Sequence, residues 1–161
     1  MKQTLASGVI PQITAIFGTC GGGMSLVPAL TDFTFMESSK AKLFVNSPNA
    51  IQGNDISKNN TSSAEFQSEK AGLVDVLGTE AEIIESIREL VGILPVNNEE
   101  DSSYGECLDD LNRICSGIEN AVEDTSIVLS ELSDGQFFFE TKAGFAKDMV
   151  TGFIRLNGMT V

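Results

Sequence analysis

The sequence predicts an α/β fold, because short apolar runs typical of buried strands alternate along the chain with segments of helical periodicity. At 161 residues, with 42% hydrophobic residues and a mean hydropathy of +0.07, the chain can bury one substantial core. No apolar run approaches the roughly 20 residues of a membrane span, and the first residues lack the pattern of a secretory signal. We therefore expect a cytoplasmic protein without a membrane span.

The first half of the chain predicts short strands on either side of a glycine-rich turn at residues 18–23. Pro11 lies near the start of the first strand, where its missing N–H matters least, and Phe33 and Phe35 fall on one face of the second. The predicted elements follow in this order: a strand over residues 9–17, a helix over 24–30, and strands over 31–36 and 41–45.

A polar stretch and the clearest helix of the chain come next. Residues 53–68 are rich in Gly, Asn, Ser and Thr with little periodicity, which predicts a surface loop, and residues 72–77 predict another strand. Thr79 and Glu82 have the spacing of a capping box, in which each side chain satisfies the backbone N–H of the other residue. Apolar residues then recur at helical spacing until Pro95, which predicts a helix over this stretch.

The last third of the chain mixes an acidic stretch with one further helix. Residues 97–105 predict an acidic loop, and residues 106–124 are ambiguous between a weak helix and irregular chain. Asp124 or Thr125 can cap a helix that runs through Leu132.

A hairpin is expected at the end of the sequence. A strand over residues 148–156 is followed by Asn157-Gly158, a type I′ turn signal, and by a return arm at residues 159–161. Three residues are too few to complete a ladder, so we expect the chain to be a segment of a longer polypeptide. The phenylalanines at 137–139 predict a position in the core or at a subunit interface.

Charge is distributed unevenly and restricts the partners. The formal net charge is −13, from 23 acidic and 10 basic residues, yet residues 1–60 hold four lysines against three acidic residues. No basic stripe is present, so we expect no nucleic-acid partner. The acidic residues between 99 and 110 match no calcium-loop spacing, which predicts a solvated loop and no metal site.

The chain has no histidine, which removes the Cys–His and Ser–His pairs of nucleophilic catalysis. Its three cysteines, Cys20, Cys107 and Cys115, form no C-x-x-C pair and are expected to be free or buried thiols. We interpret Cys20 as a bystander rather than a nucleophile. Ser25 lacks the Gly-x-Ser-x-Gly context of a hydrolase serine. Any catalysis must therefore rest on other groups.

The glycine-rich turn at residues 18–23 is the place where the backbone itself suggests chemistry. It stands between an apolar strand and a potentially helical run, an arrangement that gathers bare N–H groups and can hold an anion or a developing oxyanion. A tight turn or a close helix–strand approach would explain the glycines as well. Lys40 and Lys42 could meet a small anionic ligand, or lie as solvated surface lysines.

Three consecutive stretches resemble the carboxyltransferase subunits of biotin-dependent acyl-CoA carboxylases, and propionyl-CoA carboxylase β subunits in particular. They are Ser7 to Ile13, Gly18 to Gly23, and Pro28 to Met36. The likeness continues in the same order through residues 43–45, 87–91, 94–95, 97–98, 144–147 and 152–158. It covers nearly the whole chain.

The resemblance implies a fold and a division into domains. The family is built from two crotonase/ClpP-like domains of ββα spiral units. Residues 1–148 would be the later part of the first, N-terminal carboxyltransferase domain, and residues 149–161 the truncated opening hairpin of the second. Family members have a second oxyanion donor pair in that second domain, to which no residue of this chain corresponds. The isolated fragment is therefore expected to be inactive.

The resemblance also implies a reaction. A carboxyl group would move between carboxybiotin and an acyl-CoA, such as propionyl-CoA or acetyl-CoA, through an enolate stabilised by an oxyanion hole. The ureido nitrogen of biotin would take the α-proton, so no side-chain base is needed. Gly22 and Gly23 fall on the family's first donor pair and are the implied catalytic residues, with Gly21 and Cys20 as cofactor-binding neighbours. Biotin would arrive on a carrier protein, and no metal is implied. The implied partners are biotin carboxyl carrier and biotin carboxylase components, in a homo-oligomeric parent.

Three alternatives stay open. The chain could belong to a biotin-dependent acyl-CoA decarboxylase, to a different crotonase-fold enzyme such as a hydratase or thioesterase, or to a non-enzymatic acidic interaction domain. A hydratase or thioesterase would require carboxylates near the turn. Where many family members have Ser-Gly-x-Ala-His before the capped helix, this chain has Lys70 to Asp75, and Gly21 replaces a common alanine. The first exchange leaves acyl selectivity and the direction of the reaction open.

Overall fold

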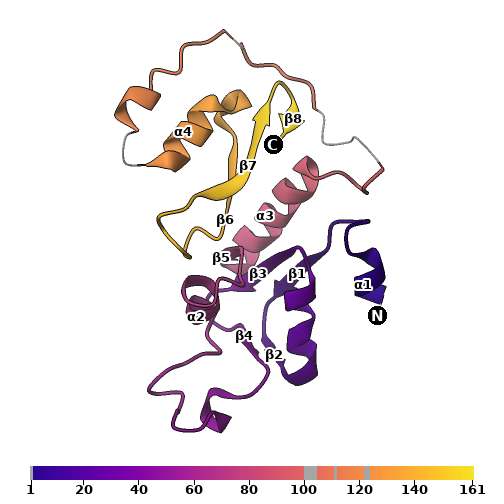
Figure 1. Cartoon of the computed structure of the whole chain (residues 1–161), viewed down its shortest axis with the longest axis vertical. Coiled ribbons are helices and arrows are strands. Elements are labelled where there is room, and N and C mark those ends of the chain that lie inside the picture. Colours follow the sequence, from indigo (N-terminus) through magenta and orange to yellow (C-terminus); the bar gives the residue numbers. More distant parts are fainter. Residues whose placement is uncertain (1, 100–104, 111, 122–123) are drawn as a thin grey trace.

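The computed structural model describes residues 2–99, 105–110, 112–121 and 124–161, and shows an elongated α/β molecule with small sheets along its length (Figure 1). Its helices and strands are α1 (Lys2–Ala6), β1 (Ile13–Ile16), β2 (Thr19–Gly21), η1 (Gly22–Leu26), η2 (Pro28–Leu30), β3 (Phe33–Glu37), β4 (Lys42–Phe44), η3 (Pro48–Ala50), α2 (Ala64–Glu69), β5 (Val76–Gly78), α3 (Glu80–Ile93), η4 (Ile118–Asn120), α4 (Thr125–Leu132), η5 (Asp134–Gln136), β6 (Phe138–Thr141), β7 (Thr151–Leu156) and β8 (Met159–Thr160), where η marks a 3₁₀ helix.

Successive strand pairs stack on one another in a spiral. Strand β1 pairs in parallel with β3, and β3 with β5, while β2 pairs in parallel with β4. Parallel neighbours need a crossover connection, and helical segments supply it here: η1 and η2 follow β2, and α2 follows β4. Two strands and a helical segment therefore form the repeating unit, which confirms the predicted α/β class with ββα spiral units.

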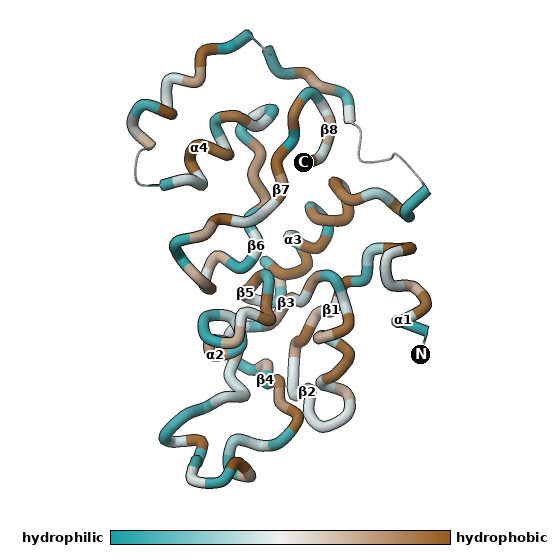
Figure 2. Tube along the Cα trace, viewed as in Figure 1, coloured by the Kyte–Doolittle hydropathy of each residue, from teal (hydrophilic) through white to brown (hydrophobic). Residues whose placement is uncertain are grey.

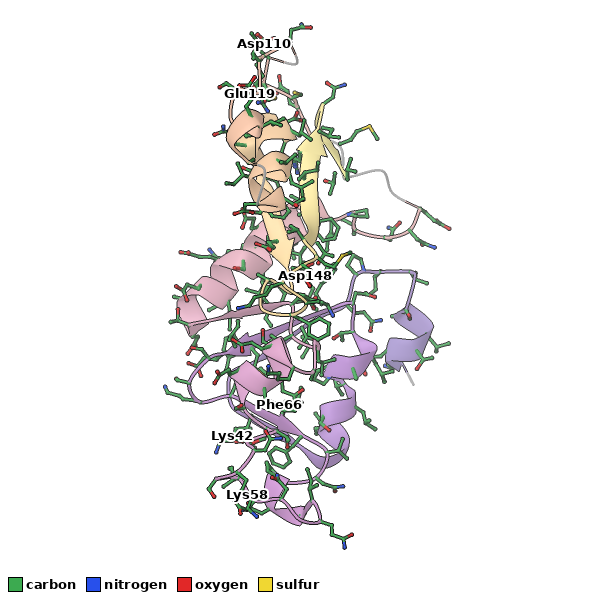
Figure 3. All side chains as sticks on the ribbon, turned by 60° about the vertical axis from the view of Figure 1, so that its left-hand side comes forward. Lys42, Lys58, Phe66, Asp110, Glu119 and Asp148 are labelled. Atoms are coloured by element: carbon green, nitrogen blue, oxygen red, sulfur yellow. The ribbon has the colours of Figure 1, made fainter. Side chains whose placement is uncertain are left out.

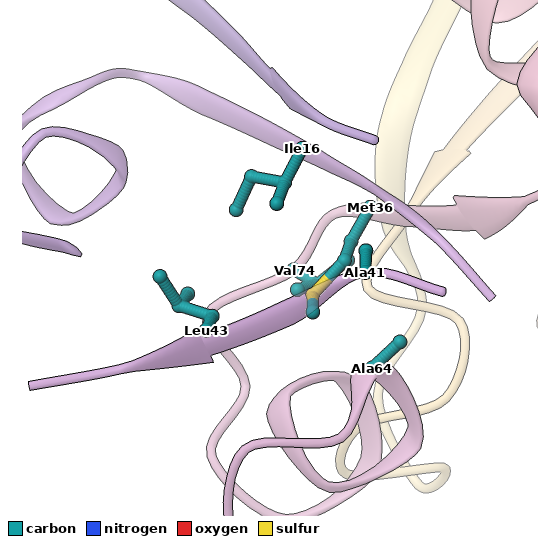
Figure 4. Close-up of a cluster of buried hydrophobic side chains, with 6 residues drawn as sticks. All are labelled: Ile16, Met36, Ala41, Leu43, Ala64 and Val74. Atoms are coloured by element: carbon teal, nitrogen blue, oxygen red, sulfur yellow. The ribbon is translucent and has the colours of Figure 1, made fainter. Parts of the chain in front are cut away.

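Strand β3 lies between two hydrophobic clusters. Phe35 and Met36 are both fully buried and point to opposite faces, because side chains alternate along a strand. One cluster contains Phe35, Ile83, Leu90, Ile93 and Phe139. The other contains Ile16, Met36, Ala41, Leu43, Ala64 and Val74, and Figure 4 shows these side chains converging between the strands and α2.

Helix α3 begins as the sequence predicts. The Thr79 side chain accepts a hydrogen bond from the Glu82 N–H, and the Glu82 carboxylate accepts one from the Thr79 N–H at 2.7 Å, which completes the capping box. Ile83 and Leu90 lie on the same face of the helix and are fully buried, and they pack it against the β1–β3–β5 sheet. The chain leaves the helix at Leu94, directly before Pro95.

The C-terminal region forms an antiparallel sheet in the order β6-β7-β8. Asn157 and Gly158 both have positive φ, at 54° and 80°, which confirms the predicted hairpin turn. Phe153 of β7 contacts Phe33, with ring centroids 5.8 Å apart, so this sheet packs on the same core as α3. The division into domains at residues 148/149 stays a prediction.

Several predicted elements differ from those observed. Residues 19–21 are a short strand rather than part of a turn, because they pair with β4. The helix predicted over 24–30 is two 3₁₀ helices, η1 and η2, with Val27 between them. Pro28 is the first residue of η2, a position where its missing N–H costs no helical hydrogen bond. The strands predicted over 9–17, 72–77 and 148–156 occupy only 13–16, 76–78 and 151–156.

Two elements were missed because their composition disguises them. Helix α2 lies inside the predicted loop at 53–68, where Ser63 caps it and Ala64 packs into the core. Most of its residues are hydrophilic, as Figure 2 shows. Strand β6 begins in the phenylalanine run, at Phe138, and continues to Thr141, with Phe139 buried in the core. Parts of the predicted acidic loop and of the ambiguous stretch, residues 100–104, 111 and 122–123, lie outside the described residues.

The turn between β3 and β4 generates a prediction about pH. The Glu37 carboxylate accepts hydrogen bonds from the Ser39 hydroxyl at 2.7 Å and from the N–H groups of Lys40 and Ala41. These bonds, that of Ser39 first, lower the pKa of Glu37 from 4.5 to about 2. The stabilisation is complete above the unfolded-state pKa and is lost as pH falls from about 4.5 towards 2.

We expect Glu37→Gln to lower the free energy of unfolding at pH 7 and to flatten its decline between pH 4.5 and 2. Urea denaturation at a series of pH values measures both effects. Glu85→Gln, at an exposed position of α3, removes the same charge and should leave the free energy of unfolding at pH 7 nearly unchanged. Equal stability curves for Glu37→Gln and the wild type would contradict the role of this carboxylate.

Candidate functional site

The glycine run starts as a strand that lies unusually close to its neighbour. Gly21 has extended backbone angles, φ −127° and ψ 161°, and stands opposite Phe44 in the β2–β4 ladder. A Cβ atom at Gly21 would lie 2.8 Å from a ring carbon of Phe44, well inside van der Waals contact. Glycine at this position therefore serves close packing of β2 on β4, which is a structural role.

Gly22 turns the chain out of the strand. Its φ of +64° lies in the left-handed region, which glycine adopts without strain, and η1 starts at this residue. A Cβ atom at Gly22 or at Gly23 would meet no other atom within 4 Å. The backbone of this pair is thus open on the side where other residues carry side chains, and a ligand can approach it.

Ser25 forms a hydrogen bond within this turn. Its hydroxyl donates a hydrogen bond to the carbonyl oxygen of Gly22 at 2.6 Å, and the residue is only 6% exposed. The sequence predicted no role for Ser25 beyond excluding it as a hydrolase nucleophile. The signal for the observed role is its spacing, since a serine three residues after a carbonyl commonly bonds back to it in a helical turn.

A hollow of about 300 Å³ borders the run. Its wall combines the end of β1, the start of β2 and parts of η1 and η2, and consists of Thr14, Ala15, Ile16, Phe17, Gly18, Thr19, Cys20, Met24, Val27 and Pro28. Of the predicted site residues, Cys20 lines this hollow, whereas Gly21, Gly22 and Gly23 stand beside it. Cys20 is a partly buried free thiol that also packs against the core.

Positive charge lies close to the run. Lys42 is exposed and stands opposite Thr19 in the β2–β4 ladder, and Lys40 is exposed in the preceding turn. Figure 3 shows Lys42 at one end of the molecule and Asp110 and Glu119 at the other. The uneven charge of the sequence is therefore a separation in space, and the glycine run lies away from the acidic end.

Asp75 connects three segments around β3. Its carboxylate accepts a hydrogen bond from the Thr34 N–H at 2.7 Å and lies 3.9 Å from the ammonium group of Lys142. Burial raises the pKa of Asp75, while the Thr34 bond and the Lys142 charge act in the opposite direction. The Thr34 hydroxyl in turn donates to the Pro28 carbonyl at 3.1 Å. The segment that departs from the family pattern is thus linked to η2, which follows the glycine pair.

Across residues 2–99, 105–110, 112–121 and 124–161, no group of three or more His, Cys, Asp and Glu side chains is placed to hold a metal ion. Within the same residues, no helix has the length and apolar composition that crossing a membrane requires.

The close approach of β2 and β4 generates a second prediction. Gly21→Ala should lower the free energy of unfolding by about 1–3 kcal/mol, because its methyl group would overlap the Phe44 ring. In a chain that already carries Phe44→Leu, the same change should cost less, and urea denaturation of the four proteins of the double-mutant cycle measures the difference.

Gly23→Ala is the matched control for this cycle, since a methyl group at that position meets nothing within 4 Å. It should change the free energy of unfolding much less than Gly21→Ala does. Equal costs at Gly21 and Gly23, or no coupling between positions 21 and 44, would show that the contact with Phe44 does not require the glycine.

Comparison with known proteins supplies the family. The model of the carboxyl transferase domain family matches residues 1–161. The propionyl-CoA carboxylase carboxyltransferase subunit of Haloferax mediterranei is 36% identical over 99% of this chain and 33% of its own length. The mitochondrial propionyl-CoA carboxylase beta chain of Rattus norvegicus is 31% identical over 100% of this chain and 32% of its own length. The chain thus spans about a third of the length of these relatives.

Solved structures agree with the fold. A transcarboxylase 12S structure, described as a hexamer with hydrolysed methylmalonyl-coenzyme A bound, has a TM-score of 0.88 and 31% identity over 99% of this chain and 33% of its own. The beta subunit of P. aeruginosa geranyl-CoA carboxylase has a TM-score of 0.52 and 24% identity over 98% of this chain and 35% of its own, and supports the crotonase-type fold alone. With every residue matched by the family model and the ββα spiral in place, the chain belongs to the carboxyl transferase domain family.

Proposed function

We propose that this chain forms an acyl-CoA-binding part of a biotin-dependent carboxyltransferase of the propionyl-CoA carboxylase type. In this proposal Gly22 and Gly23 donate backbone N–H groups to the thioester oxygen of the substrate. The observation that carries it is the open backbone of this glycine pair at the end of β2, in a chain of the carboxyl transferase family.

The residues present fit a thioester ligand. The glycine pair has no side chain and a free approach, the adjoining hollow is lined mainly by apolar and small residues, and the exposed Lys42 lies beside Thr19 within reach of anionic groups. Cys20 in the wall of the hollow and Gly21 at the strand end would be neighbours of the ligand. The transcarboxylase 12S structure, which has a coenzyme A ester bound, supports the same ligand class for this chain.

The chemistry that this chain would supply is electrostatic. Removing the α-proton of an acyl-CoA places negative charge on the thioester oxygen, and N–H groups fixed in advance at that oxygen stabilise the transition state more than the ground state. Biotin, carried on a separate protein, would supply the activated carboxyl group and a base for the α-proton. The backbone donors do not need a histidine, which this sequence lacks.

Partners follow the same proposal. The relatives are named as subunits, and transcarboxylase 12S is described as the hexameric core of a multienzyme complex. We propose that the protein containing this chain is likewise a homo-oligomer that works with a biotin carboxyl carrier and a biotin carboxylase. The segment that donates the second oxyanion pair in the family would complete the site, so the 161 residues alone would bind acyl-CoA without turnover. A cytoplasmic location stays a prediction, since some relatives are mitochondrial.

The other candidate functions find less support. A hydratase or thioesterase requires a carboxylate beside the oxyanion hole, and the residues that line the hollow include no Asp or Glu. The family match disfavours a purely structural acidic domain, which would also retain no acyl-CoA. The proposal covers both directions of the reaction, carboxylation and decarboxylation.

Replacing Gly23 with proline tests the proposed donor. Proline has no N–H, so Gly23→Pro in the intact carboxyltransferase should lower kcat by roughly 10²–10³, the usual effect of removing one oxyanion donor. Gly23→Ala keeps the N–H and meets no neighbouring atom, so it should retain far more activity than Gly23→Pro. Steady-state carboxyl transfer to propionyl-CoA, assayed with the biotin carrier, measures both variants.

Calorimetry with propionyl-CoA separates this function from the non-enzymatic alternative. We expect binding by the folded 161-residue chain and weaker binding by Gly23→Pro, with circular dichroism to verify folding. Carboxyl transfer at the wild-type rate by Gly23→Pro would show that this N–H is not an oxyanion donor.

A further inference from the structure

We propose that Ser25 is a positioning residue that fixes the direction of the Gly23 N–H. The inference rests on the proposed function, because it concerns the donor that this function assigns to Gly23. It goes beyond that function in assigning a role to a buried side chain that does not itself touch the substrate.

One peptide unit joins Gly22 to Gly23. The carbonyl of Gly22 and the N–H of Gly23 belong to the same planar trans peptide, so they point in opposite directions. The Ser25 hydroxyl donates to the Gly22 oxygen at 2.6 Å. Whatever holds that oxygen also sets where the Gly23 hydrogen points, and the hydrogen is directed away from Ser25.

This peptide unit needs such a restraint. Rotating it changes ψ of Gly22 and φ of Gly23, and glycine permits a wider range of these angles than any other residue. A Cβ atom at either position would meet no atom within 4 Å outside the adjoining residues and the backbone of η1, so no packed side chain holds this peptide in place. Beyond the backbone of η1, the Ser25 hydrogen bond supplies a side-chain restraint on the donor, from the opposite side.

The restraint is itself held in place. Ser25 is 6% exposed, so its hydroxyl is shielded from water that would compete for the Gly22 oxygen. A hydrogen bond accepted at the carbonyl also polarises the peptide, which makes the N–H of the same unit a stronger donor. Ser25 would thus both orient and strengthen the Gly23 donor, and its own proton is engaged rather than available for nucleophilic chemistry.

Removal of the hydroxyl should therefore affect turnover more than substrate binding. In the intact carboxyltransferase, Ser25→Ala is expected to lower kcat about tenfold, less than the 10²–10³ lost with the donor itself, with a change in KM for propionyl-CoA below about threefold. Ser25→Thr restores a hydroxyl at the same place and should recover most of kcat. A merely structural role would lower the melting temperature without this split between kcat and KM.

Thr31→Val is the matched control. At the end of η2, the Thr31 hydroxyl donates a similar bond to the Pro28 carbonyl at 3.0 Å. Its other hydrogen-bond partners are Thr14 and Phe33, so its bonds do not involve the Gly22–Gly23 peptide. It should lower the melting temperature as Ser25→Ala does and leave kcat near the wild-type value. A loss of kcat equal to that of Ser25→Ala would overturn the inference, because it would show that any loosening of this segment suffices.

The results separate a failure of the Ser25 inference from a failure of the proposed function. If Gly23→Pro is inactive and folded Ser25→Ala has the kcat of the wild type, Ser25 has no positioning role and the proposed function stands. If Gly23→Pro is fully active, the proposed function fails, and the inference with it. Should Ser25→Ala not fold, Ser25→Cys takes its place, since a thiol of similar size is a weak donor. A reduced kcat with restored activity in Ser25→Thr supports the inference, and a wild-type kcat in Ser25→Cys overturns it.

Discussion

The double burial of strand β3 is the constraint on which the rest of the structure depends. Phe35 fills one hydrophobic cluster and Met36 the other, and both side chains are fully buried. A strand in this position cannot satisfy its backbone with water, so its polar groups must find protein partners. Strands β1 and β5 provide them along its two edges, and the Asp75 carboxylate provides one for the Thr34 N–H. A carboxylate is thereby drawn towards the core, and burial raises its pKa.

The glycine run is held to this frame at two points. On one side, the Thr34 hydroxyl donates to the Pro28 carbonyl and fixes the segment that follows η1. On the other, β2 lies so close to β4 that a Cβ atom at position 21 would be 2.8 Å from the Phe44 ring. Between these points stand Gly22 and Gly23, which have no side chains to anchor them. Packed elements thus hold both ends of a pair that has no side-chain anchors of its own, an arrangement that suits the proposed backbone site.

Sequence reasoning succeeded where the signal is local. The capping box of Thr79 and Glu82 and the Asn157-Gly158 turn depend on residues within a few positions of one another, and both were predicted. It failed where the outcome depends on distant residues. Residues 19–21 are a strand only because β4 pairs with them, and α2 is recognisable only once Ala64 has a core to enter.

The site shows the same division between local and distant information. The glycine pair could be found from composition and resemblance, whereas the link from Asp75 through Thr34 to Pro28 joins residues that lie far apart in the sequence. This link cannot be predicted without knowledge of the fold. Ser25 is an intermediate case, because its partner is only three residues away, but a short polar side chain also suits many other environments.

The proposed site, made of backbone N–H groups, would have a consequence for how this protein responds to pH. A peptide N–H does not titrate in the working range of an enzyme, so the donors proposed at Gly22 and Gly23 keep their charge distribution at any pH at which the chain is folded. Among the ionisable groups whose pKa the fold shifts, Glu37 and Asp75 act instead on the stability of the frame, and in opposite directions. The carboxylate of Glu37 stabilises the fold above its ordinary pKa, whereas the raised pKa of Asp75 means that its carboxylate is less favourable in the fold as pH rises. A dependence of turnover on pH near neutrality would therefore not arise from the proposed oxyanion donors themselves.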